Sequence, residues 1–271
     1  MAEPQKFTDL GRPRRVWAIG AVHAQPDHLE AVHGAVAARF LPGDRLVYLG
    51  NMIGWGERVL ETLDALLAFR RTLLARRGMA AGDIVYLRGA QEEMWQKLLQ
   101  LQFAPDPPQV LDWMMRQGAA TTLAAYGGSP EQGMAAARGG AMALGRWTQG
   151  LRRAMQARPG HENLFSALRR AAYARPPGEE GRGLLLVSAG IDARRSLEEQ
   201  GDAFWWGGGG FSRLSGPYGG FSRVVRGFDP ARQGAAVGDH TATLDGGCGF
   251  GGHLVCACLT PSGDILELFQ A

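Results

Sequence analysis

The N-terminal third of the chain alternates short apolar runs with helical patterns, and this order limits the fold more than any other sequence feature. The apolar runs at 15–20, 45–50 and 84–87 predict buried strands. Between them, residues 26–39 and 60–74 carry apolar side chains at helical spacing. Strands and helices alternating at these lengths predict parallel strands joined by crossover helices, which is an α/β fold.

The middle of the chain has a different composition. Residues 91–180 are rich in Ala, Met, Gln and Arg and are interrupted by Pro and Gly, which predicts short helices inserted as a cap. Strands are predicted again beyond this segment, at 184–188, 223–227, 253–259 and 264–269. No internal repeat is visible, and we expect residues 1–271 to form a single domain with an N-terminal tail over about residues 1–14.

Composition excludes several classes of protein. Hydrophobic residues make up 45% of the chain and charged residues 20%, which is typical of a globular protein and not of a disordered one. No apolar run approaches the roughly 20 residues of a membrane span, and the first residues lack the apolar core of a secretory signal. The three cysteines, Cys248, Cys256 and Cys258, include no Cys-x-x-Cys pair, and we interpret them as buried free thiols. We therefore expect a cytoplasmic protein with no membrane partner.

The net charge of +3 conceals one basic segment. Residues 138–182 carry nine arginines and three glutamates, a local net charge of +6, so the remainder of the chain has a net charge of −3. This distribution excludes a uniformly basic nucleic-acid-binding protein, and we expect no specific nucleic-acid partner. Two adjacent pairs, Arg152 with Arg153 and Arg169 with Arg170, are predicted on helices and are candidates for docking a partner. The alternative is a solvated helical face with buried aliphatic stems.

Two short motifs carry weaker signals. Residues 247–252 match Gly-x-Gly-x-x-Gly, but the alternating pattern that follows predicts a strand, whereas a dinucleotide site requires a helix there. His23, His28 and His33 are spaced by five residues, so they do not share one helical face and do not predict a zinc site. Neither motif carries a function.

The ends of the three N-terminal strands carry the strongest signal. They are Gly20-Ala21-Val22-His23-Ala24, Gly50-Asn51-Met52-Ile53-Gly54-Trp55-Gly56 and Leu87-Arg88-Gly89-Ala90-Gln91-Glu92. Their order and spacing resemble the signature of calcineurin-like metallophosphoesterases, the family of the bacterial serine/threonine protein phosphatases: Gly-Asp-x-His-Gly, Gly-Asp-x-x-Asp-Arg-Gly and Arg-Gly-Asn-His-Glu. Later segments resemble the family in the same order, at residues 113–127, 186–190, 225–230 and 244–254. The resemblance implies a β-sandwich of two mixed sheets flanked by helices, with a helical cap.

The resemblance also implies that the metal ligands are missing. The family binds two metal ions through an Asp and a His of the first strand end, a bridging Asp, an Asn and two later His. The corresponding positions in this chain are Ala21, His23, Asn51, Ala90, Ser188 and Phe228. Only His23 keeps the family's residue, and both carboxylates are absent. Because carboxylate charge offsets the lost hydration of divalent ions, we expect no metal centre and no cofactor.

The groups that act on the phosphate are replaced as well. The position of the family's catalytic His is Gln91, which has no proton to donate near neutral pH, and its Asp partner is Gly54. The two positions of the phosphate-clamping arginines are Trp55 and Gly207. The sequence therefore predicts that none of these positions is catalytic.

This pattern predicts a pseudophosphatase, a binding or scaffolding protein that uses the former substrate groove without hydrolysis. Its partner is expected to be a protein, and its oligomeric state is left open. The candidate binding residues remain around the groove: His23, Asn51, Trp55, Arg88, Gln91 and Glu92.

Two alternatives stay open. The chain could be an active phosphoesterase with a one-metal or displaced site formed by His23, Asn51 and His240, loaded with manganese, iron or zinc. It could instead be a structural subunit that docks on a larger assembly through its basic cap.

Overall fold

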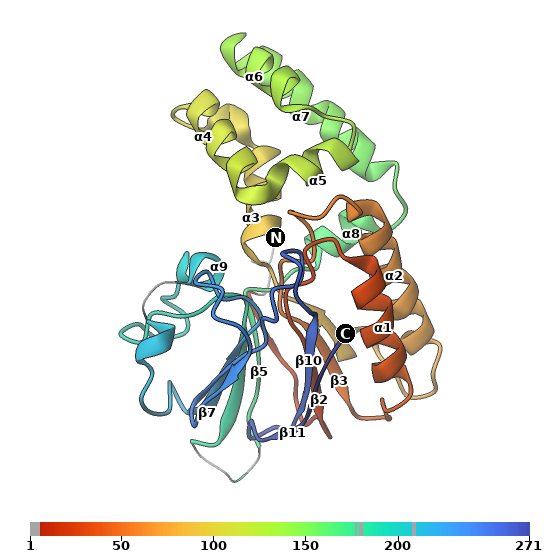
Figure 1. Cartoon of the computed structure of the whole chain (residues 1–271), viewed down its shortest axis with the longest axis vertical. Coiled ribbons are helices and arrows are strands. Elements are labelled where there is room, and N and C mark those ends of the chain that lie inside the picture. Colours follow the sequence, from red (N-terminus) through yellow and green to blue (C-terminus); the bar gives the residue numbers. More distant parts are fainter. Residues whose placement is uncertain (1–5, 177, 179–180, 208–209) are drawn as a thin grey trace.

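The structure, a computed structural model, describes residues 6–176, 178, 181–207 and 210–271. Two β-sheets pack face to face, helices cover their outer surfaces, and a further group of helices projects from one end of this sandwich (Figure 1). The α/β architecture of two mixed sheets flanked by helices agrees with the sequence prediction. Among the described residues, no helix combines the length and the apolar character that crossing a bilayer requires.

Sheet I contains the three strands predicted near the N-terminus. β2, β3 and β4 run parallel, and β10 pairs antiparallel with both β2 and β11. In the order β11-β10-β2-β3-β4, the bounds are Ile265–Gln270, Val255–Leu259, Val16–Ile19, Arg45–Tyr48 and Ile84–Tyr86. Because the parallel strands share one direction, the residues after their carboxyl ends lie along the same edge of the sheet.

Sheet II combines strands from the whole length of the chain. In the order β1-β5-β6-β7-β9-β8, the bounds are Phe7–Asp9, Ala171–Ala174, Gly183–Val187, Phe221–Arg226, Thr241–Thr243 and Ala236–Val237. β5 is antiparallel to β6 and β8 to β9, whereas the other neighbours are parallel. The sheet is therefore mixed, and the residues after β6 and β7 face those after the parallel strands of sheet I.

Three apolar clusters hold these layers together. Between the sheets, inward side chains such as Val47 and Leu186 form one buried cluster. On the outer face of sheet I, the helices α1 (Pro26–Ala37) and α2 (Val59–Leu74) complete a second cluster. On the outer face of sheet II, the third cluster packs against α9 (Ala203–Trp206) and the 3-10 turn η4 (Phe211–Arg213).

The helical cap begins directly after β4. α3 (Ala90–Leu98) leads into it, and α8 (His161–Ser166) returns the chain to the sandwich (Figure 1). The cap itself consists of α4 (Pro107–Met114), a π-helical turn (Met115–Ala119), α5 (Ala120–Ala125), α6 (Pro130–Arg138) and α7 (Ala141–Gln156). Short 3-10 turns precede β4 and α4, at Ala81–Asp83 (η1) and Leu101–Phe103 (η2).

Two predicted boundaries are wrong. The helical insertion ends at Ser166 and not near residue 180, because Ala171–Ala174 form β5 of sheet II. The N-terminal tail is shorter than expected, because Phe7–Asp9 form β1 alongside β5; residues 1–5 lie outside the described residues. Alanine-rich β5 has helical propensity, so only its neighbours in the sheet make it a strand.

The basic segment is not wholly helical. Arg152 and Arg153 lie on α7 as predicted, but Arg169 and Arg170 follow α8 and are not helical, which corrects the sequence prediction. Arg169 instead forms a β-bridge with Leu87, at the end of β4. Glu179 and Glu180, which entered the charge count of this segment, lie outside the described residues.

The interpretations of the cysteines and of the glycine motif are confirmed. All three cysteines are free and buried. The Gly-x-Gly-x-x-Gly segment at 247–252 forms turns that lead into β10, so no helix N-terminus is available there for a pyrophosphate.

Candidate functional site

Glycines bring the strand ends unusually close together. A Cβ atom at Gly20, after β2, would lie 1.9 Å from the carbonyl oxygen of Leu244. One at Gly50, after β3, would lie 2.6 Å from the amide nitrogen of Gly89, and Gly50 also has a φ of +87°. Only glycine is compatible with such approaches. The loops after the strands of sheet I are therefore pressed against one another and against sheet II.

Within sheet I, hydrogen bonds join the predicted ligand positions. His23 N donates to Asn51 O at 2.8 Å, and Gln91 N, next to Ala90, donates to Asn51 Oδ1 at 3.0 Å. His23 and Asn51 adopt left-handed backbone conformations, with φ of +48° and +52°. Such conformations at non-glycine residues cost about 1–3 kcal/mol each and are found mainly at functional sites.

The remaining predicted positions are Ala21, which follows β2 of sheet I, and Ser188 and Phe228, which follow β6 and β7 of sheet II. Ala21 N donates to Gly227 O at 2.9 Å, and Phe228 N donates to Ser188 O at 2.9 Å. Ala21 and Ser188 are buried, and the ring of Phe228 packs against the imidazole of His23, with 5.5 Å between the ring centroids. The structure therefore brings all six predicted positions together in one place.

His23 is held in an apolar environment. Besides Phe228, the ring of Phe250 packs edge-on against it, with 5.3 Å between centroids. Burial lowers the pKa of His23 to about 3; the Ile53 backbone opposes this shift slightly, and the positive charge of Arg232 adds to it. The imidazole is therefore neutral throughout the physiological range.

Five buried polar atoms in this cluster have no hydrogen-bond partner within the described protein. They are both ring nitrogens of His23, Asn51 Nδ2, Gln91 Oε1 and Ser188 Oγ. Buried polar atoms are normally paired, so this concentration makes the cluster a candidate site for water or another polar ligand.

These atoms do not fit a pair of divalent metal ions. All of the side chains are uncharged, whereas such ions are held in proteins by carboxylate or thiolate charge together with neutral ligands. Among the described residues, no group of three or more His, Cys, Asp or Glu side chains is arranged to hold a metal. The cluster suits water or an uncharged polar group instead.

Glu92 directly follows Gln91 of this cluster, and its oxygens are fully engaged. It accepts from the backbone amides of Gly89, Asn51, Met52 and Ile53, at 2.7 to 3.3 Å. Burial raises the pKa of Glu92, and these four hydrogen bonds oppose the shift. Glu92 was predicted as a candidate binding residue, but its contacts are those of a group that ties two loops together.

Gln91, Gly54 and Trp55 stand at the positions that the resemblance assigns to the catalytic acid, its partner and a phosphate-binding arginine, and they pack closely together. A Cβ atom at Gly54 would lie 2.0 Å from Gln91 Oε1, so the glutamine side chain occupies the volume that a side chain at Gly54 would need. Trp55 N donates to Gly118 O at 3.1 Å, and the indole lies against Gly118, in the π-helical turn of the cap. These contacts of Trp55 with Gly118 join the cap to the site.

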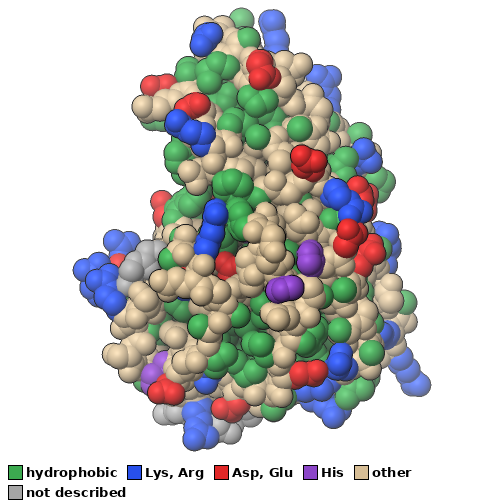
Figure 2. Space-filling view, in the orientation of Figure 1, with side chains coloured by type: hydrophobic (Ala, Val, Ile, Leu, Met, Phe, Trp, Pro, Cys, Tyr) green, Lys and Arg blue, Asp and Glu red, His purple; other side chains and the backbone are tan. Residues whose placement is uncertain are grey.

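A small groove remains beside these residues. Its volume is about 140 Å³, and it lies where the cap meets the sandwich, with Trp55, Gln91, Trp206, Phe228 and Arg232 among its walls. In Figure 2 the surface between the cap and the sandwich is hollowed, and hydrophobic side chains gather in the hollow.

Arg232 and two tryptophans shape the mouth of the groove, and the sequence prediction missed their roles. The Arg232 guanidinium lies 3.7 Å from the ring centroid of Phe250 and 5.6 Å from that of Trp55, which are cation–π distances. Trp113 of α4 contacts Trp206 of α9 at 5.3 Å between centroids and so bridges the cap and the sandwich. Arg232 lies only four residues after Phe228, a predicted site position, and this short separation could have indicated that Arg232 lies near the site.

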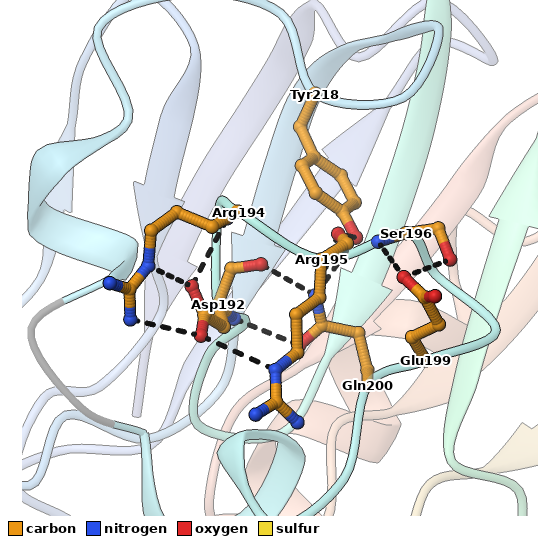
Figure 3. A network of polar contacts seen from close by, with 7 residues as sticks. All are labelled: Asp192, Arg194, Arg195, Ser196, Glu199, Gln200 and Tyr218. Atoms are coloured by element: carbon orange, nitrogen blue, oxygen red, sulfur yellow. Dashed lines mark hydrogen bonds and ion pairs between the residues drawn. The ribbon is translucent and has the colours of Figure 1, made fainter.

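A polar network holds the loop that carries α9 (Figure 3). The buried side chain of Gln200 accepts from Asp192 N at 2.8 Å and donates to Asp192 O at 2.6 Å and to Tyr218 Oη at 2.9 Å. Asp192 also forms ion pairs with Arg194 and Arg195, at 3.2 and 3.7 Å. The network therefore supports the loop whose helix α9 places Trp206 in the wall of the groove.

Other predicted residues lie apart from the groove. Arg88 forms an ion pair with Glu93 at 3.0 Å. His240 hydrogen-bonds to Ser222 O at 3.1 Å, at the start of β7, so it lies at the opposite end of this strand from the His23 cluster. Gly207, with a φ of +69°, ends α9, and a Cβ atom there would lie 3.1 Å from Pro230.

Comparisons with known proteins support the fold. No profile of a known family and no curated protein matches the sequence. Solved structures do match, and one of them is described as "a putative diadenosine tetraphosphatase". It is 18% identical to this chain, with 98% of each chain covered and a TM-score of 0.58. The chain has a metallophosphoesterase-like fold. At this identity the likeness concerns the fold alone.

Proposed function

We propose that this chain is a phosphoesterase-like binding protein that does not hydrolyse phosphoesters. The observation that carries the proposal is the state of His23, the one family-type ligand that the chain retains. It is a neutral imidazole packed edge-on against Phe228 and Phe250. Metal activation of water, protonation of the leaving group and clamping of phosphate each require groups that this site has replaced.

The groove favours a protein partner over a small substrate. Its volume of about 140 Å³ is below the roughly 300–1,000 Å³ typical of small-molecule sites, but it suffices for one large side chain. Its walls are mainly aromatic, and Arg232 adds a positive charge with no carboxylate within ion-pair distance among the described residues. The partner is therefore a segment with one large apolar anchor next to an acidic residue.

Two measurements test the loss of hydrolysis. Purified protein is assayed for bound metals and for turnover of p-nitrophenyl phosphate, and its melting temperature is followed as manganese is added. We expect background turnover and no manganese-dependent rise, because a ligand that binds the folded state raises its melting temperature. Metal-dependent turnover that His23→Ala abolishes would instead support the alternative of an active phosphoesterase.

A peptide-display selection tests the binding proposal. Random peptides are selected on the unmodified protein, and Arg232→Glu serves as the counter-selection. We expect enriched peptides to place Trp, Phe or Leu beside Asp or Glu, and to lose binding to Arg232→Glu. Arg213→Glu, whose substitution lies outside the groove, is the matched control. Enrichment without an acidic residue, or equal binding to both variants, would contradict the proposal.

A further inference from the structure

A larger cavity lies on the sandwich, outside the groove. It has a volume of about 640 Å³ and is enclosed by α2, η1, the edge strand β4, Thr8 of β1 and the start of α8. None of its lining residues also lines the groove. Its apolar walls are formed by Leu67, Ile84 and Leu164. The cavity is therefore a separate feature and falls within the size range of small-molecule sites.

The cavity carries a concentrated positive charge. Among the described residues that line it are Arg70, Arg71 and Arg169, and no aspartate or glutamate. None of the three forms an ion pair with a described residue. The nearest carboxylates along the chain are already paired, Asp83 with Arg45 at 3.1 Å and Asp64 with His161 at 3.1 Å. Arg70 and Arg169 donate to backbone carbonyls at 2.8 to 3.3 Å, but these contacts leave the positive charges of all three guanidinium groups unneutralised, which favours an anionic ligand.

A buried phenol points to the same conclusion independently of the charge. Tyr86 lines the cavity and is 4% exposed; its oxygen lies beside the Arg70 guanidinium, a weak donor to it, and no described residue accepts its proton with good geometry. Its ring is fixed by stacking on Tyr48, with 4.9 Å between centroids. Burial raises the pKa of Tyr86 to about 12, and the neighbouring Arg70 opposes the shift. The hydroxyl is therefore a neutral donor beside a guanidinium, at a place where a ligand oxygen would satisfy it.

We propose that this cavity binds a small molecule through a diphosphate group. A single carboxylate would neutralise one of the three arginines, whereas the charge of a diphosphate can be shared by all of them. A diphosphate also presents oxygens in pairs, and a planar guanidinium can donate to two phosphate oxygens at once. Asn163, which also lines the cavity, adds an amide donor, and the apolar walls accommodate an organic substituent. Free pyrophosphate and an organic diphosphate share this chemistry.

Calorimetric titration distinguishes free pyrophosphate from an organic diphosphate as the ligand. Pyrophosphate and ADP are titrated, without metal, into the unmodified protein in a chloride buffer. Tighter binding of ADP identifies an organic diphosphate as the ligand, and equal binding identifies the diphosphate group alone. In either case, Arg70→Gln and Arg169→Gln should each weaken binding at least tenfold. Arg77→Gln, an exposed arginine that does not line the cavity, is the matched control and should bind as the unmodified protein does.

Tyr86→Phe separates a ligand contact from a structural role. Removing a buried hydroxyl whose proton has no acceptor should leave the melting temperature of the free protein nearly unchanged, because only its weak contact with Arg70 is lost. Binding should weaken several-fold. Three results would overturn the proposal: neither probe binds, Tyr86→Phe lowers the melting temperature without changing affinity, or Arg232→Gln abolishes binding while Arg70→Gln retains it. The last result would place the anion in the groove.

Discussion

Two buried histidines make the stability of this protein depend on pH. Burial lowers the pKa of His23 and of His33 to about 3, whereas an unfolded histidine titrates near 6.5. The imidazole of His33 is stacked on Phe69 and hydrogen-bonded to Tyr48, so it too has little access to water. Below pH 6.5 the unfolded chain binds protons that the folded chain cannot, which favours unfolding.

The free energy of unfolding should therefore be highest above pH 6.5 and fall as the pH is lowered toward 3. Each histidine contributes a slope of up to about 1.4 kcal/mol per pH unit in that window. Urea unfolding at several pH values measures the slope. His33→Gln should flatten it relative to the unmodified protein, while His253→Gln, at an exposed position, should not. Equal slopes for all three proteins would show that burial of His33 is not coupled to its titration.

At single positions, the sequence could predict which residues form the cluster around His23 but not how their side chains pack. The identities of Ala21, Asn51 and Ala90 follow directly from the strand-end motifs. The contact of Phe250 with His23 could not be predicted, because more than 200 residues separate the two and only the closed sandwich brings them together. The same holds for the buried Tyr86 hydroxyl, which no sequence pattern marks.

Among the elements, the loop from residue 191 to residue 218 depends on one side chain. Gln200 links Asp192 to Tyr218, and Tyr218 Oη donates in turn to Arg195 O at 2.7 Å. Gln200→Leu keeps a similar volume but removes the side-chain partner of the partly buried Asp192 N and Asp192 O and one hydrogen bond to the Tyr218 hydroxyl. It should lower the free energy of unfolding by about 2–3 kcal/mol.

The same substitution should have a local signature. Amide hydrogen exchange should accelerate in residues 191–207, including the α9 segment that bears Trp206, before it accelerates in sheet I. Gln233→Leu, at an exposed position, is the matched control. A loss of protection spread evenly over the whole chain would show that the network supports the fold as a whole and not this loop.

Elements with strong periodicity were predictable, and short ones were not. β2, β3, β4 and α2 follow from apolar runs and helical spacing that are complete within each segment. β1, β5 and β9 consist of Phe-Thr-Asp, Ala-Ala-Tyr-Ala and Thr-Ala-Thr, which have no strand pattern of their own. They are strands because sheet II offers them hydrogen-bonding neighbours, a property of the assembled fold.

For the molecule as a whole, the six positions that the resemblance assigns to metal ligands lie on loops from both sheets, so no single loop could supply a metal site. Ala21→Asp combined with Asn51→Asp would return the two carboxylates but leave Phe228, Ser188 and Gln91 in place. Phe228 fills a ligand position with a ring, and metal affinity depends on ligands that act together. Turnover of p-nitrophenyl phosphate by this double variant should remain at background.

The double variant should also be less stable than the unmodified protein, because both positions are fully buried and an unpaired charge there is costly. Thermal melting with and without manganese measures this. Ala193→Asp, outside the cluster, is a control for the added charge. Metal-dependent turnover by the double variant would show that the remaining residues do not block the chemistry.

The position of β10 in sheet I has a consequence for the synthesis of the chain. β2 emerges early, but its antiparallel neighbour β10 comprises Val255–Leu259, so one edge of β2 stays unpaired until more than 230 further residues have been translated. Open apolar edges promote association between nascent chains, and pairings this distant in sequence close slowly. Throughout that interval the sheet that is made first remains incomplete, and the sandwich can close only after β10 has emerged from the ribosome.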